Sequence, residues 1–457
     1  MKPKCERNLL EGNIYKNLLA VATPTMLGYM VQMFYDLVDM MWIGKISADA
    51  VAGVTIFSTM FWIVNVLNEI IGTSSISLIS QSYGKGDSDR TSLCIEQTLT
   101  FKFIVSILAG FIFIIILKPL LGFFTKDLIV AKSALDYGYI RIFFLPIMFS
   151  SYSVNTAFRC VGEAKIPMIT MILSAILNII LDPILMFDII PGTSIPGFNL
   201  GVFGAALATV ISMAVGFLFA FGLILSRKTK VKINVKRLFK LNFEIDKKLL
   251  TIGLPNGFEV LLRNLLGIIT LKFITSYGTT VVAAFGIGNR LSGFMFMPLL
   301  GLSMGCSTIV GQCLGSENID RATATAKSAS LLGSLLMATV SIIAMFFPTE
   351  IMSIFINDNA VIEVGIPLIR IILPASIFAG IMMGFGSVFS GSGYNKPYLI
   401  SSFVGRWLVQ IPIMYVAVNI LSLNVNWVWL AFVLAEATEM FVILFFYKKG
   451  DWKIIRV

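Results

Sequence analysis

Hydrophobic residues occur in this chain as long uninterrupted runs, and polar residues gather in the short stretches between them. Most runs exceed 18 residues, and roughly 20 apolar residues suffice for a helix to cross a bilayer. The strands of a transmembrane β-barrel alternate polar and apolar residues, so the continuous runs exclude that class. The pattern predicts an all-α polytopic membrane protein. The twelve transmembrane helices that we expect are residues 14–43, 51–80, 93–117, 134–157, 166–187, 202–226, 246–275, 280–310, 323–347, 361–390, 397–419 and 425–447.

An internal repeat divides the chain into two halves. Aligning Pro24 with Pro255 without a gap brings QSYGKGDSDR, from Gln81, onto QCLGSENIDR, from Gln312. A basic linker, 227–245, separates the expected six-helix bundles 1–226 and 246–457. Because each bundle holds an even number of helices, the second enters the membrane from the same side as the first. The expected architecture is therefore two bundles related by pseudo-two-fold symmetry along the membrane normal, which suits transporters.

The repeated QxxG segments predict a structural role. Gly84 and Gly315 fit the ends of helices, where glycine is favoured. The Asp-Arg pairs that follow, at Asp89 and Asp320, are placed to cap the next helix.

Basic residues explain the net charge of +10 by their placement. Nine Lys and Arg lie between Arg227 and Lys248, and others lie near both ends of the chain (Lys2, Lys4, Arg7, Lys448, Lys449). Four of the stretches that we assign to the outside (188–200, 276–281, 348–361 and 420–428) contain none. Under the positive-inside rule both termini are cytoplasmic, in the inner or plasma membrane of a prokaryote. Topology thus accounts for the charge, and no nucleic-acid partner is expected.

Composition removes several kinds of chemistry. The chain has no His, which excludes His-based zinc sites, proton relays and Ser-His-Asp triads. Cys5, Cys94, Cys160, Cys306 and Cys313 show no metal-ligand spacing, so we expect them to pack as small apolar residues. We expect no cofactor and no enzymatic activity. The first apolar run is too long for a signal peptide and lacks a cleavage site, so we read it as a helix.

Two carboxylates interrupt the first apolar run. Asp36 and Asp39 are three residues apart and therefore share a helix face. A carboxylate at bilayer depth costs about 2.5–3.5 kcal/mol on insertion scales, and such residues usually face a cavity or a bundle interior. A carboxylate that reaches the water layer, or one that pairs with a structural Arg, is the alternative for both residues.

A candidate ion site follows from helix direction. The first and fifth helices both run outward, and Asp39 and Asp182 each lie about five residues before the outer end. Asn178 lies one turn below Asp182, and Thr209 reaches a similar level on the sixth helix. Carboxylate, amide and hydroxyl oxygens suit a small hard cation or a shared proton. The alternative for Asp182 is that its Asp-Pro dipeptide shapes a bend.

The second half offers a more ambiguous acid. Glu259 follows Pro255 by four residues, and Arg263 follows one turn later, which is a favourable spacing for an ion pair. The sequence leaves open whether Glu259 is a neutralised structural residue or a carboxylate that binds substrate.

Several motifs resemble the multidrug and toxic compound extrusion (MATE) transporters. They are YDLVDMMWIG, LNIILDPILMF, GVFGAALATVIS, GLPNGF and the long run AAFGIGNRLSGFMFMPLLGLSMGCSTIVGQCLG. The resemblance spans nearly the whole chain and is greatest to the DinF-like branch, which includes the MepA type. It implies a monomeric secondary active antiporter that exports cationic, amphipathic compounds in exchange for H+ or Na+.

The resemblance also implies roles for individual residues. Asp39, Asn178, Asp182 and Thr209 match the family's coupling site, and they would be metal ligands if the coupling ion is Na+. Pro24 matches a proline at which the first helix bends. Two further polar positions are expected to contribute: Tyr139 lies near the outer entry, and Asn155 matches a family polar position.

Three other functions remain open at this point. A lipid-linked precursor flippase of the same superfamily would need a strongly cationic cavity, whereas Asp39 and Asp182 are acidic. An intramembrane transferase would need an acidic metal motif such as DDxxD, which is absent. A channel is disfavoured by the parallel repeat, which favours alternating access.

Overall fold

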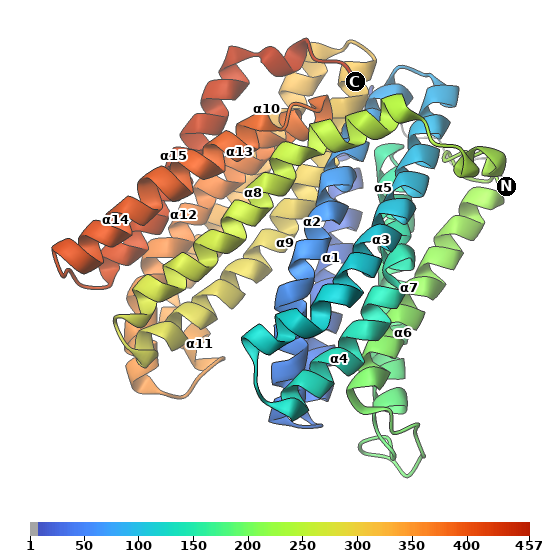
Figure 1. Ribbon diagram of the computed structural model, residues 1–457. Helices are drawn as coiled ribbons and strands as arrows, with labels where there is room; N and C mark the ends of the chain where they lie inside the picture. Colours follow the sequence, from blue (N-terminus) through green and yellow to red (C-terminus); the bar gives the residue numbers. More distant parts are fainter. Residues whose placement is uncertain (1–7) are drawn as a thin grey trace. The chain divides into compact units, whose positions relative to one another are not determined.

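The computed structural model describes residues 8–457, and this part of the chain is helical, with a single isolated β-bridge between Ile189 and Pro196. Lys2, Lys4, Cys5 and Arg7 lie outside the described residues. The prediction of an all-α membrane protein is confirmed (Figure 1). The helices are α1 Ile14–Gly44, α2 Ala48–Gly84, α3 Ser88–Phe124, α4 Leu128–Phe143, α5 Leu145–Cys160, α6 Lys165–Met186, α7 Gly201–Leu225, η1 Val235–Phe239, α8 Phe243–Thr275, α9 Thr279–Gly315, α10 Ile319–Phe346, α11 Pro348–Ser353, α12 Asn359–Ser392, α13 Lys396–Ser402, η2 Phe403–Gln410, α14 Ile411–Tyr415, η3 Val416–Ile420, α15 Asn426–Lys449 and η4 Asp451–Lys453.

Within residues 8–457, 10 helices are long and apolar enough to cross a membrane. Two expected spans fall outside that set. One is α8, and the other is the expected helix 134–157, which the structure shows as two helices, α4 and α5. Helix α4 begins at Leu128 because the Asp127 side chain accepts hydrogen bonds from the Ile129 and Val130 amides. The break at Phe144 precedes Pro146, which has no amide hydrogen to donate and lies in the first turn of α5.

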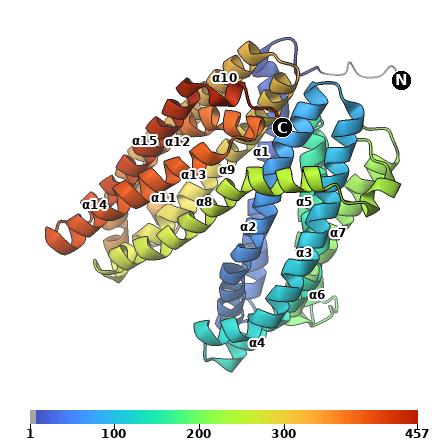
Figure 2. The ribbon, with the colours of Figure 1, turned by 45° about the horizontal axis from the view of Figure 1, so that its top comes forward.

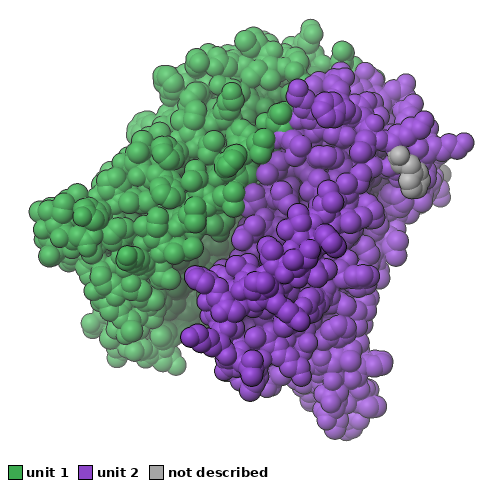
Figure 3. Space-filling view, in the orientation of Figure 1, with its two compact units in different colours: residues 1–26, 80–86, 251–457 green, residues 27–79, 87–250 purple. Residues whose placement is uncertain are grey.

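Contacts between Cα atoms group the chain into two compact units (Figure 3). Unit 2 comprises Leu27–Ile79 and Asp87–Leu250. Unit 1 comprises the chain up to Met26, Ser80–Gly86 and Thr251–Val457. Helices α1, α2 and α8 therefore each contribute residues to both units. The boundaries that we drew from the sequence stay a prediction.

Unit 2 has an aromatic core. The Phe57 ring stacks on Phe61 with centroids 5.3 Å apart, and Tyr137 meets Phe57 edge-on at 5.6 Å. Helices α6 and α7 pack along each other (Figures 1 and 2). The basic linker is tied to α3, because Gln97 Nε2 donates to the Lys240 carbonyl at 2.7 Å and Thr100 Oγ1 donates to the Leu238 carbonyl at 2.7 Å.

In unit 1, α12 packs against α9, α10 and α15. The two repeated QxxG segments meet here. A Cβ on Gly84 would lie 2.0 Å from the Gln312 carbonyl oxygen, and a Cβ on Gly315 would lie 2.0 Å from that of Gln81. These glycines are the last residues of α2 and α9, as expected, and what requires glycine is this reciprocal close approach.

The caps of the next helices differ from our expectation by two residues. Asp87 accepts from the Arg90 amide at 2.9 Å, and Asn318 accepts from the Arg321 amide at 3.0 Å. Capping by Asp89 and Asp320 was therefore wrong, since both residues already lie inside the first turn of α3 and α10. The Arg321 side chain instead donates to the carbonyls of Leu9, Glu11 and Gly12, which holds the segment just before α1 against α10.

Candidate functional site

The two carboxylates that the sequence singles out are buried in unit 2. Asp39, on α1, is 7% exposed, and Asp182, on α6, is fully buried. They lie close enough for their charges to interact. Helix α6 continues past Asp182 and Pro183 to Met186, so the Asp-Pro dipeptide lies within the helix.

Three buried oxygen atoms of this pair and of the neighbouring Asn178 have no hydrogen-bond partner among the described residues. They are Asp39 Oδ1, Asp182 Oδ2 and Asn178 Oδ1. The amide nitrogen of Asn178 donates to Asp182 Oδ1 at 3.0 Å, which turns the amide oxygen away from that carboxylate atom. Buried polar atoms normally have partners. Three unpartnered oxygens therefore fit a small hard cation or a proton, which would supply the missing positive charge.

Thr209 lies on α7, the neighbour of α6, and is 3% exposed. Its hydroxyl donates to the Ala205 carbonyl at 3.0 Å, so the proton is already used and only oxygen lone pairs remain for a ligand. Asn155, on α5, also has a buried side-chain oxygen that lacks a partner among the described residues.

The tyrosine beside these acids is Tyr137, not Tyr139. Tyr139 is 37% exposed, whereas Tyr137 is 6% exposed. Tyr137 also interacts electrostatically with Asp36, Asp39 and Asp182. Adjacent turns of a helix bury every third or fourth residue, so two residues two apart seldom share a face. The signal in the sequence is the spacing of Tyr137 and Arg141, which are four residues apart and so share one face of α4.

Two further residues of the first half, Asp36 and Pro24, were also expected to contribute to the site. The Asp36 side chain is exposed, and Pro24 is buried inside α1. Sequence reasoning missed Arg141, on α4. Its guanidinium acts electrostatically on Asp36 and Asp39, so the acidic group contains one basic member.

A second buried group of charges lies elsewhere in unit 2. Lys102 is 1% exposed and donates to Asn68 Oδ1 at 2.7 Å. Glu69 and Arg159 both interact with it through their charges. Arg159 Nη2 donates to Thr156 Oγ1 at 3.1 Å. These residues come from three helices, which is why no local sequence pattern indicated them.

In unit 1 the predicted Glu259–Arg263 pair is formed. Arg263 Nε donates to Glu259 Oε1 at 2.7 Å. The pair belongs to a larger network, because Arg263 also lies 3.9 Å from Glu439. Arg406 donates to Glu439 at 2.5 Å and also pairs with Glu436. The role of Glu259 in substrate binding stays a prediction.

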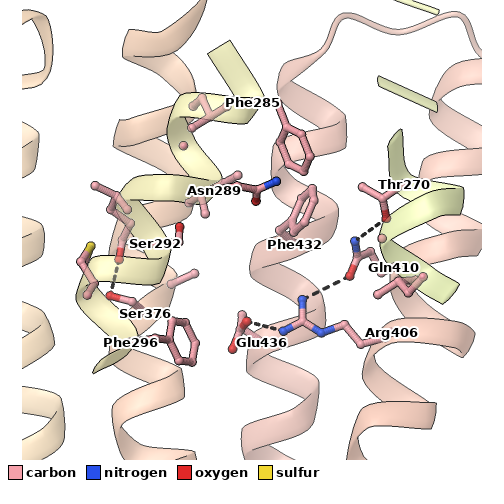
Figure 4. Close-up of a pocket in the computed structure, with 18 of the residues that line it drawn as sticks. Thr270, Phe285, Asn289, Ser292, Phe296, Ser376, Arg406, Gln410, Phe432 and Glu436 are labelled. Carbon is pink, nitrogen blue, oxygen red and sulfur yellow. Dashed lines mark hydrogen bonds and ion pairs between the residues drawn. The ribbon is translucent and has the colours of Figure 1, made fainter. Parts of the chain in front are cut away.

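This network forms one wall of a cavity of about 270 Å³ in unit 1. Figure 4 shows a continuous line of polar side chains, from Thr270 through Gln410 and Arg406 to Glu436. The Phe285 and Phe432 rings lie together beside it, with centroids 5.8 Å apart. Arg406 and Gln410 belong to the π-helical segment η2, a conformation that is frequent at functional sites.

Known proteins resemble this chain over nearly its whole length. It is 27% identical over 454 residues to the probable multidrug resistance protein YoeA of Bacillus subtilis strain 168, covering 98% of this chain and 96% of that protein. It is 25% identical over 441 residues to the multidrug export protein MepA of Staphylococcus haemolyticus strain JCSC1435, covering 95% and 93%. A solved MOP superfamily transporter from Pyrococcus furiosus has a TM-score of 0.89 at 23% identity, covering 96% of both chains.

The MatE family model matches the chain twice, at residues 24–184 and 255–416. The two matches begin at Pro24 and Pro255, the prolines that the internal repeat aligns. They cover well over half of the chain. The protein therefore belongs to the MatE family of membrane-embedded multidrug efflux transporters and is not an enzyme.

Proposed function

We propose that this protein is a secondary active antiporter that exports cationic, amphipathic compounds in exchange for H+ or Na+. Asp39, Asn178 and Asp182 form the coupling site, with Thr209 beside them. In the prokaryotic cell the protein lies in the inner or plasma membrane, with both termini in the cytoplasm. The observation that supports the proposal most directly is the group of three buried, unpartnered oxygens in unit 2.

The site works by alternating between two charge states. With an ion or proton bound, the carboxylates are neutralised and tolerate burial. Without it, two neighbouring carboxylates repel each other and favour hydration. A bound small cation would supply the charge that the three oxygens lack. The chain's own contribution is to hold Asp182 in place through Asn178 and to keep Asp39 out of bulk water.

The test is transport in vesicles with the proton and sodium gradients imposed separately. We expect one of the two gradients to drive efflux of a cationic dye. Asp39→Asn and Asp182→Asn should each abolish the gradient-driven part at equal expression. An Asp188→Asn variant serves as the control, because Asp188 follows α6 and caps the Ile189 amide in the exposed loop. Dye efflux at the wild-type rate by either site variant would remove that residue from coupling.

A further inference from the structure

Arg141 is held in unit 2 by aromatic rings. Its guanidinium carbon lies 5.8 Å from the centre of the Phe61 ring and 5.7 Å from that of Tyr137. Arginine over an aromatic face is stabilised at such distances. The rings hold the side chain in place without neutralising its charge.

The guanidinium also lacks a contact ion pair. Among the described residues no carboxylate oxygen lies within 4.0 Å of it, and its Nε atom is buried without a hydrogen-bond partner. Arginine stays protonated in proteins, so the charge persists. The Arg141 side chain is half-buried, and removing even part of an unpaired charge from water is costly. The compensation comes through space, from Asp36 and Asp39.

The group of charged residues around Arg141 contains more acidic than basic side chains. Asp36, Asp39 and Asp182 provide three carboxylates, and Arg141 provides one fixed positive charge. Tyr35 and Tyr152, which also face Arg141, are uncharged. This group also contains hydrogen-bond acceptors and a donor that lack partners. The acceptors are oxygens of Asp39 and Asp182, and the donor is Nε of Arg141.

We infer that Arg141 is an internal counter-ion, which competes with mobile cations for Asp36 and Asp39 and so sets the cation affinity of the coupling site. A cation that binds at Asp39 must share the carboxylate charge with Arg141. When the cation leaves, the guanidinium remains as the partner of the two acids. The negative charge of the empty site is thus still partly neutralised by Arg141. This inference rests on the proposed function only in that the acidic group binds a cation.

The test measures cation binding rather than transport. Na+ is titrated into the purified full-length protein by calorimetry, with choline replacing Na+ at constant ionic strength. Arg141→Met keeps an apolar stem and removes the charge, and it should tighten Na+ binding about tenfold or more, since one repelling unit charge is lost. Arg141→Lys, which keeps the charge, should bind Na+ like the wild type. Lys118→Met is the matched control, because Lys118 is an exposed cation of α3 in the same unit.

Three results would contradict the inference: unchanged or weaker Na+ binding by Arg141→Met, tightening by Arg141→Lys of the same size, or no measurable Na+ binding by any of these proteins. If Arg141→Met proves unstable by its melting curve, Arg141→Gln replaces it. Adding Asp39→Asn to Arg141→Met should remove the gain. Tighter binding without gradient-driven efflux would retain the role of Arg141 and reject antiport. Gradient-driven efflux with unchanged binding would do the opposite.

Discussion

Tyr137 and Tyr139 lie two residues apart on α4 and have opposite environments. The first is buried against Phe57 and beside three carboxylates, and the second is exposed. Tyr137 therefore belongs to the surroundings of the acidic group, and Tyr139 lies at the surface of the unit. The pair offers a matched comparison within one helical turn.

We expect Tyr137→Phe to reduce gradient-driven efflux by roughly tenfold, which corresponds to losing one hydrogen-bonding group near a charge. The ring and its packing remain, so the melting temperature should change little. Tyr139→Phe should leave efflux unchanged. Efflux measured in vesicles decides this, and equal rates for the two variants would show that the hydroxyl of Tyr137 has no part in coupling.

Arg406 and Arg263 share a network but differ in exposure. The Arg406 side chain is 9% exposed, whereas that of Arg263 is 45% exposed and has a second carboxylate nearby in Glu439. Removing one partner of a buried pair costs about 3–5 kcal/mol. A half-exposed pair contributes about 1 kcal/mol or less.

Arg406→Met should therefore destabilise the protein much more than Glu259→Gln does. Thermal unfolding in detergent, followed by tryptophan fluorescence, gives the order. Adding Glu436→Gln to Arg406→Met should recover part of the loss, because one unpaired carboxylate is removed. If Glu259→Gln proves the more damaging change, the fold depends on the Glu259–Arg263 pair rather than on Arg406.

Residues close in sequence were predicted better than residues that only the fold brings together. The i,i+4 pairs Asn178–Asp182 and Glu259–Arg263 follow from helix geometry, and the structure forms both. Arg406 meets Glu439 across 33 positions, and no local pattern encodes such a contact. The same limit hid Arg141, whose acidic neighbours lie on α1.

Apolar runs in the sequence predict well which helices form and roughly where they begin and end. The expected helix 280–310 is α9, Thr279–Gly315, whose additional last turn ends where Gly315 meets Gln81. Two features were not predictable from apolar runs. The chain breaks at Phe144 where Pro146 removes a donor, and η2 and η3 adopt π-helical hydrogen bonding within one expected span. Both depend on backbone hydrogen bonds, which hydrophobic periodicity does not report.

Pro24 lies inside α1, and the residues that follow Met26 belong to a different unit from those before it. Proline removes one backbone hydrogen bond and makes a helix easier to bend. Pro24→Ala should therefore slow dye efflux more than it weakens dye binding. Rates in vesicles and binding by fluorescence titration separate the two effects. Weaker binding with normal turnover would mean that Pro24 shapes a binding surface.

The QxxG crossing in unit 1 makes a second prediction for helices. Gly315→Ala places a Cβ 2.0 Å from the Gln81 carbonyl oxygen, so α2 and α9 must separate. We expect a loss of about 1–3 kcal/mol, as for other overpacked sites. Gly222→Ala on α7, where a Cβ meets nothing within 4 Å, should be neutral or stabilising. Unfolding midpoints of the two variants test the crossing, and equal midpoints would contradict it.

For the whole molecule, the internal repeat and the packing units divide the chain differently. The two copies of the repeat are divided by the basic linker, which hydrogen-bonds to α3 in unit 2. The packing units exchange segments, since unit 1 includes Ser80–Gly86 and the chain up to Met26. Sequence similarity between the halves reports common descent of their helices, and it does not report which helices pack together.

This exchange of segments sets an order for biosynthesis. Met26 packs against Gly301, and Gln81 packs against Gly315, so each waits for more than 200 residues to be made. At about 5–20 residues per second the ribosome needs roughly 10–50 s for that stretch. Unit 2, by contrast, is complete once Leu250 has emerged. A nascent chain arrested after residue 250 should therefore resist limited proteolysis within unit 2 while being cleaved between Leu9 and Gly12. Full-length release should abolish that cleavage, because Arg321 then binds these carbonyls.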